Sequence, residues 1–185
     1  MAQFLKIVSV TETFKYTITM LLTYRKAEKA TVVLNDLIKI NNDRITCYQQ
    51  ALDQSTNLDS DLKRLFKEII ADGQKYKQEL KDKIKELDGN PKDGLTLSGM
   101  VHRAWVDLKV TFTGNTRNAM ISFCEYNEEI AQHAYTAALN VCAEMNKEVY
   151  TLVESQISAL RASYDSLRKC HEAHHFMDPG LIYFN

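Results

Sequence analysis

Four long stretches of this sequence carry the hydrophobic period of an amphipathic helix, with apolar side chains three and four residues apart. They cover about residues 29–52, 61–87, 116–139 and 149–175. Short connections join the first stretch to the second and the third to the fourth, so each pair is predicted to form an antiparallel hairpin. The connection between the two pairs is long. The sequence therefore predicts an all-α protein built from four long helices.

The long connection, from Gly89 to Gly114, contains a further amphipathic segment, LSGMVHRAWVDLK, at residues 97–109. Ser98 can cap a short helix there, and Trp105 would then face the bundle. Connections that are short, long and short in order are typical of four-helix bundles with one crossover. The predicted fold class is therefore a ferritin-like four-helix bundle with one long crossover that contains a short helix.

At 185 residues the chain is long enough for one domain with its own hydrophobic core. We expect the bundle at residues 31–175 and a C-terminal tail at residues 176–185. Residues 1–30 form an N-terminal extension whose structure the sequence leaves open. Its Thr- and Val-rich composition fits a strand, a frayed helix or sequence upstream of the true start. Its apolar run ITMLL, at residues 18–22, is far too short to span a bilayer.

The charge of the chain is balanced, with 23 Lys and Arg residues against 24 Asp and Glu residues. This balance gives no electrostatic reason to expect binding to nucleic acid or to a membrane surface. The four cysteines form no Cys-x-x-Cys pair and lie among apolar helical positions: Cys47, Cys124, Cys142 and Cys170. This placement favours reduced thiols in a cytoplasmic protein over a disulfide framework.

The first and third stretches share a polar residue placed seven positions before a tyrosine. In the first stretch Asn41 precedes Tyr48, and in the third Glu128 precedes Tyr135. In both cases the polar residue lies on or beside the inner apolar stripe. This echo indicates an internal two-fold relation between the hairpins, around which a bundle would build a symmetric site.

A di-metal carboxylate site in such a bundle needs a Glu from each of two helices and a Glu-x-x-His motif from each of the other two. At or near the corresponding inner positions, the four stretches offer Asn41, Gln74, Glu128 and Tyr164. One carboxylate cannot supply such a ligand set. We therefore predict that these four residues form a polar bundle interior and bond to one another. No catalytic residue is predicted.

The fourth stretch ends in CHEAHHF, at residues 170–176, which holds three of the five histidines. Glu172 and His175 have the Glu-x-x-His spacing, but Glu172 lies about 100° from His171 on a helical wheel. His171 continues the inner stripe, so the Glu172–His175 pair faces away from it. Cationic histidines are stabilised at a helix C-terminus, and we interpret this cluster as a polar helix end. His171 and His175 could hold an adventitious Zn or Ni ion, and with Glu128 they complete the metal-ligand candidates.

Two motifs also indicate a family: LNDLIKINNDRITCYQQAL at residues 34–52 and LSGMVHRAWVDLK at residues 97–109. Together with TG at residues 113–114 and CEYNEE at residues 124–129, they resemble a bacterial domain family of unknown function with a ferritin-like four-helix bundle. The resemblance covers roughly residues 32–170.

The resemblance implies an architecture similar to that of ferritins and rubrerythrins, without an established activity. It also implies that Asn41 stands where rubrerythrin-like proteins place an iron-binding Glu. Near Tyr164, where relatives carry a His, this chain departs from the family pattern.

These observations favour a non-enzymatic, cytoplasmic bundle with a binding, structural or stress-associated role, acting as a homodimer or with another protein partner. One alternative is a metal-binding, ferritin-like redox or metal-handling protein that uses Fe, Mn or Zn. Another is a small-molecule carrier that uses the space around Gly73. The ligand inventory favours the first of the three.

Overall fold

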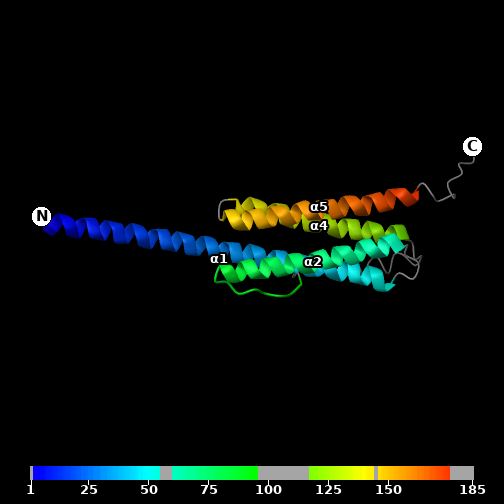
Figure 1. Ribbon diagram of the computed structural model, residues 1–185, viewed down its shortest axis with the longest axis horizontal. Helices are drawn as coiled ribbons and strands as arrows, with labels where there is room; N and C mark the ends of the chain where they lie inside the picture. The colour runs from blue at the N-terminus through cyan, green and yellow to red at the C-terminus, as the bar shows by residue number, and fades with distance from the viewer. Residues whose placement is uncertain (1, 55–59, 96–116, 144–145, 176–185) are drawn as a thin grey trace, which may run out of the picture.

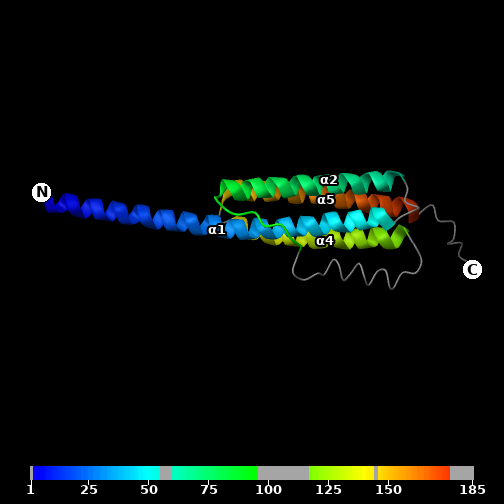
Figure 2. The same cartoon turned by 90° about the horizontal axis from the view of Figure 1, so that it is seen from below.

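The computed structural model describes residues 2–54, 60–95, 117–143 and 146–175. These residues form four helices: α1 Ala2–Gln54, α2 Ser60–Glu86, α4 Arg117–Cys142 and α5 Lys147–His175. α1 packs against α2 and α4, and α5 packs against α4 and α2. Figures 1 and 2 show the resulting elongated bundle. The predicted all-α bundle of four long helices is therefore confirmed.

The crossover helix predicted at residues 97–109 and the C-terminal tail at residues 176–185 lie outside the described residues. All four cysteines lie within them and are free thiols.

The inner faces of the helices bury the side chains that the hydrophobic period predicts. On α2 the buried residues recur every three or four positions: Leu62, Phe66, Ile69, Gly73, Tyr76, Leu80 and Ile84. The buried side chains of the four helices fall into two apolar clusters. One is built around Leu34, Leu80, Tyr135 and Val153, and the other around Cys47, Phe66, Cys124 and Leu167. Burial of each large aliphatic side chain favours folding by about 1.5–3 kcal/mol.

α1 has 53 residues against 27 in α2, and its N-terminal half projects beyond the other helices (Figure 1). The N-terminal extension is therefore helical and continuous with the bundle, which excludes a strand. Among the described side chains of α1, Ala30 is the first that is buried. No helix in the described ranges is both long and apolar enough to cross a membrane.

α2 ends where the chain turns back along α1. Asp88 takes the left-handed conformation, with φ of 56°, and the amide of Gly89 donates to the carbonyl of Ile84 at 2.9 Å. A Cβ atom at Gly89 would lie 2.6 Å from Thr31 Oγ1. Glycine is therefore needed here because the turn approaches α1 closely, while Asp88 provides the reversal of the backbone.

Candidate functional site

A layer of buried polar side chains lies at the middle of the bundle, between the two apolar clusters. α1 contributes Asn41 and Arg44, α4 contributes Asn127 and Glu128, and α5 contributes Gln156. Each of these residues is no more than 3% exposed. Because polar groups in such surroundings need partners, their contacts define what this layer can do.

An ion pair between α1 and α4 is the strongest contact of the layer. Arg44 Nε donates to Glu128 Oε1 at 2.6 Å, and the Tyr48 hydroxyl donates to the same oxygen at 2.8 Å. Burial alone would lower the pKa of Arg44, but the charge and hydrogen bond of Glu128, together with Tyr48 and Tyr135, more than offset burial, and the pKa is raised. The guanidinium therefore remains charged in the bundle interior.

A second chain of hydrogen bonds connects all four helices. Asn41 Nδ2 donates to the Tyr135 hydroxyl at 2.7 Å, and that hydroxyl donates to Gln156 Oε1 at 2.8 Å. Gln156 Nε2 in turn donates to Glu79 Oε2 at 2.9 Å and to the carbonyl of Tyr76 at 3.3 Å. The chain thus runs from α1 through α4 and α5 to α2.

The two contacts made by the tyrosines are related by the two-fold echo in the sequence. Asn41 on α1 bonds to Tyr135 on α4, and Tyr48 on α1 bonds to Glu128 on α4. The polar residue of each helix therefore meets the tyrosine of the other, as an antiparallel pair with an internal two-fold requires. Because the polar residue and the tyrosine are seven positions apart in both helices, the distance between the two contacts is the same along α1 as along α4.

Both network tyrosines act as neutral phenols. Burial raises the pKa of Tyr48 well above its usual range, and the neighbouring Glu128 raises it further. Burial likewise raises the pKa of Tyr135. Each hydroxyl therefore keeps its proton at neutral pH and can donate to the oxygen that it faces.

Gly73 on α2 lies beside the ion pair. A Cβ atom there would lie 2.9 Å from Ile45 Cγ1 and 3.7 Å from Arg44 Nη1. The missing side chain is thus what lets Ile45 and the guanidinium approach the α2 backbone. Because α1 side chains fill this space, the interpretation as a small-molecule carrier loses its basis.

The residues of this layer do not fit a di-metal centre. Glu128 is the carboxylate at the centre of the layer, and its Oε1 already accepts from Arg44 and Tyr48. The guanidinium has no lone pair to offer a metal and cannot lose its proton. Elsewhere in the described ranges, no group of three or more His, Cys, Asp or Glu residues is placed to hold a metal ion.

The four residues predicted for the polar interior divide into two pairs. Asn41 and Glu128 are fully buried and belong to the network. Gln74 is exposed, because it lies one position past the buried glycine of α2 and so points about 100° away from the inner stripe. Tyr164 lies half-buried at the edge of the bundle, where its hydroxyl donates to the exposed Glu129 at 2.8 Å. The placement of Gln74 and Tyr164 in the interior was therefore wrong.

The histidine-rich end of α5 holds a separate polar contact. His171 Nδ1 lies 3.1 Å from Glu125 Oε1 on α4, and both side chains are partly buried. Glu172 is exposed and pairs with Arg168 at 3.2 Å, so it faces away from the bundle as the helical wheel predicts. α5 ends at His175, whose side chain is outside the described set.

Two network residues, Arg44 and Gln156, were not predicted from the sequence. Arg44 follows Asn41 by three positions and precedes Tyr48 by four, which places all three on one helix face. An arginine on an inner face needs a buried carboxylate as its partner, and Glu128 was the available one. That combination could have predicted the burial of Arg44, whereas nothing in the sequence indicated the burial of Gln156.

The chain matches a protein-family model. The model described as "Domain of unknown function (DUF2383)" matches residues 29–141, which include α2 and most of α4. Among curated proteins, none matches this chain.

Solved structures of other proteins share its architecture. The bacterioferritin of Desulfovibrio desulfuricans, a protein with a diiron site, is 20% identical with a TM-score of 0.67, covering 87% of each chain. A ferritin-like, diiron-carboxylate protein of Bacillus anthracis is 18% identical with a TM-score of 0.62, covering 79% of this chain and 97% of its own. Dps from Thermosynechococcus elongatus is 17% identical with a TM-score of 0.62, covering 87% of this chain and 99% of its own. The ferritin-like fold class is therefore confirmed.

Proposed function

The chain belongs to the DUF2383 family, and from this premise we propose that it is a non-enzymatic ferritin-like bundle whose buried ion-pair network stands in place of a di-metal centre. In this proposal the protein is a cytoplasmic binding or structural component. The observation that carries it is the contact of Arg44 Nε with Glu128 Oε1 at 2.6 Å, in the middle of the bundle.

Electrostatic repulsion supports the proposal that the ion pair stands in place of a metal at the centre of the bundle. A divalent cation bound to Glu128 would lie close to the Arg44 guanidinium. At about 4 Å and an effective dielectric constant of about 20, a dication and a unit positive charge repel each other by about 8 kcal/mol. One carboxylate does not offset such a repulsion, because it is shared with the guanidinium. Arg44 therefore acts as the resident cation of this site.

The network also gives the bundle a specific register. Arg44 and Glu128 are unfavourable in the apolar interior unless they meet, and a displaced α1 or α4 would leave each of them unpaired. Asn41 and Tyr135, which bond to each other beside the ion pair, impose the same condition. The polar layer thus selects one alignment of α1 with α4 among those that the apolar clusters alone would accept.

Metal analysis of the full-length protein, purified from a culture supplemented with iron and manganese, tests this proposal. We expect less than one metal ion per chain and the same content in a Glu128→Gln variant. About two equivalents per chain, lost in Glu128→Gln, would instead establish the metal-handling alternative. A His171→Ala/His175→Ala variant is the control, since metal that only this variant loses is bound at the end of α5 and not in the bundle.

A further inference from the structure

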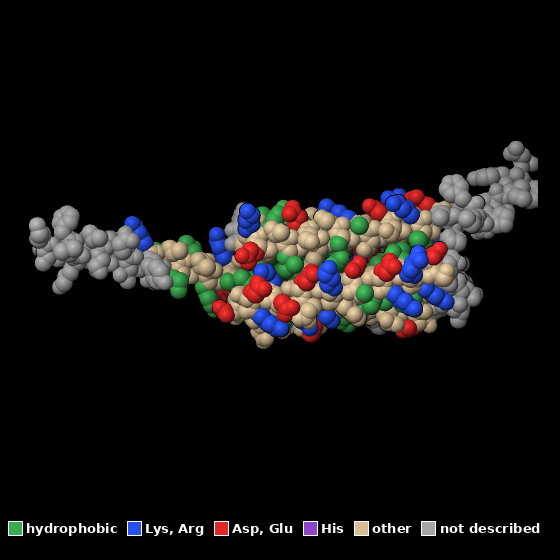
Figure 3. Space-filling model, in the orientation of Figure 1, with side chains coloured by type: hydrophobic (Ala, Val, Ile, Leu, Met, Phe, Trp, Pro, Cys, Tyr) green, Lys and Arg blue, Asp and Glu red, His purple; other side chains and the backbone are tan. Residues whose placement is uncertain are grey.

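The N-terminal part of α1, residues 2–29, extends beyond the bundle and is here called the arm. Within it, residues 18–24 read ITMLLTY and contain no charge. Their large apolar side chains are between 41% and 70% exposed: Ile18, Met20, Leu21, Leu22 and Tyr24. On the face of the bundle seen in Figure 3, in contrast, acidic and basic side chains are closely intermixed. An apolar helix segment of this kind marks an interaction surface.

The apolar side chains of the arm surround the helix. Ile18, Leu21 and Leu22 share one face, whereas Met20 lies about 200° from Ile18 on a helical wheel, on the same side as Tyr24. A helix that carries apolar side chains on more than one face is typically covered by protein.

The threonines between these residues also suit burial. Thr19 Oγ1 donates to the carbonyl of Lys15 and Thr23 Oγ1 to the carbonyl of Thr19, each at 2.9 Å. Because their hydroxyls are satisfied within the helix, covering this segment leaves none of these donors without a partner.

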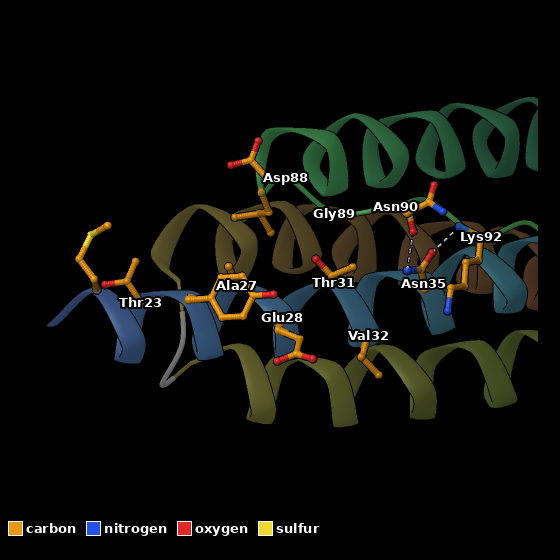
Figure 4. A pocket seen from close by; sticks show the side chains of 13 residues that line it. Thr23, Ala27, Glu28, Thr31, Val32, Asn35, Asp88, Gly89, Asn90 and Lys92 are labelled. Carbon is orange, nitrogen blue, oxygen red and sulfur yellow. Dashed lines mark hydrogen bonds between the residues drawn. The ribbon is translucent and has the colours of Figure 1, made fainter. Parts of the chain in front are cut away.

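A groove lies at the base of the arm, beside its own apolar side chains (Figure 4). It is a cavity of about 590 Å³ between α1 and the turn after α2, with Tyr24, Ala27 and Thr31 on one side and Leu87 on the other. The wall of the groove is fixed by Asn35, whose side chain bonds to the backbone of the turn at 3.3 Å and 2.6 Å. The groove is therefore formed before any partner binds.

We propose that a second copy of this chain covers the arm, with the two arms antiparallel and the N-terminal end of each lying in the groove at the base of the other. Only the antiparallel arrangement brings the N-terminal part of the partner's arm to the groove, because in a parallel pair the partner's own bundle would lie at that level.

Charge favours the same arrangement. The base of the arm is basic, because Arg25, Lys26 and Lys29 outnumber Glu28 there. A parallel pair would place two such basic segments side by side, whereas an antiparallel pair separates them.

The arm offers a partner a long helical surface, because residues 2–29 number 28 and are helical throughout. One partner helix contacts about half of them, and the groove adds further contacts toward the about 20–30 residues on each side of a standard interface. Since the family match begins at residue 29, the arm lies almost wholly outside it, and this inference does not depend on the proposed function.

Sedimentation equilibrium of the full-length protein tests the pairing. We expect twice the chain mass of 21.2 kDa. A Leu21→Glu/Leu22→Glu variant should weaken dimerisation at least about 100-fold and sediment as a monomer, with unchanged helical content. The matched control is Val141→Glu, which introduces a Glu at an apolar α4 residue that is 46% exposed, and it should remain dimeric.

Cysteine cross-linking tests the antiparallel geometry. Under mild oxidation, Thr19→Cys should yield a disulfide-linked dimer, because the two copies of residue 19 meet near the crossing. Thr136→Cys is the control, since Thr136 is also an exposed helical threonine bonded to the carbonyl four residues earlier.

Three results would overturn the proposal. The first is a monomeric wild-type protein at tens of micromolar. The second is a dimer that the Leu21→Glu/Leu22→Glu variant leaves intact. The third is a monomer that co-sediments with phosphatidylcholine–phosphatidylglycerol vesicles through the arm, which would make a lipid surface the partner.

Discussion

At the scale of single residues, Arg44 and Glu128 depend on each other. Removing one partner of a buried ion pair leaves the other charge uncompensated, which typically costs about 3–5 kcal/mol, whereas replacing both by apolar residues is often nearly neutral. We therefore expect Arg44→Met to lower the free energy of unfolding by about 3–5 kcal/mol. The double variant Arg44→Met/Glu128→Met should lose less than either single variant. Urea unfolding of the three variants measures this coupling, and strictly additive losses would refute it.

Tyr48 makes the stability of the folded protein fall with pH in the alkaline range. Its pKa in the folded state is raised, chiefly by burial, so above pH of about 10 the unfolded chain releases this proton while the folded protein retains it. The folded state then binds more protons, and stability must fall as pH rises, by up to about 1.4 kcal/mol per pH unit for each such group. In Tyr48→Phe the decline between pH 10 and 11 should be shallower than in the wild type. Equal slopes in urea unfolding at these pH values would contradict this assignment.

The residue pattern predicted part of this site and missed the rest for physical reasons. Asn41 and Glu128 follow from the helical period, since both lie on or beside an inner stripe. Arg44 did not, because a charged residue is buried only when a partner 84 positions away along the chain meets it. Gln74 was placed wrongly because its neighbour, not Gln74 itself, occupies the stripe.

At the scale of helices, α1 and α2 approach closely at Gly73. Alanine there would gain about 1 kcal/mol of helix propensity over glycine. Its Cβ atom would, however, lie 2.9 Å from Ile45 Cγ1, and overpacking of this kind costs about 1–3 kcal/mol. We expect Gly73→Ala to destabilise the wild type but to stabilise an Ile45→Ala background. Thermal unfolding of both pairs measures the change, and an effect of the same sign in both would argue against close packing at this point.

Helix boundaries and faces were largely predictable, whereas the arm was not. The stripe from Leu62 to Ile84 was read directly from the sequence and is buried as expected. Residues 18–24 lack the polar face on which a helical period depends, so their sequence could not separate helix from strand. Their helical state follows from continuity with the amphipathic part of α1.

At the scale of the whole molecule, a ferritin-like fold does not determine a ferritin-like activity. The diiron proteins that share this architecture are at most 20% identical to the chain, so the likeness extends to the fold alone. At the centre of this bundle, the guanidinium of Arg44 bonds to the carboxylate of Glu128. The family to which the chain belongs leaves the function open, and the centre of the bundle is therefore the part to test.

Thermal unfolding of the full-length protein, at one fixed protein concentration, tests this account most directly. The midpoint is measured with a chelator and then with excess Fe²⁺ or Mn²⁺ under anaerobic conditions. We predict the same midpoint in all three conditions, and a midpoint lower by on the order of 10 °C for Arg44→Met in each of them. A metal bound by the folded state at 100 times its Kd would add about 2.7 kcal/mol, or roughly 5–10 °C. A rise of that size in the wild type, absent in Glu128→Gln, would contradict the claim that Arg44 occupies the place of the metal.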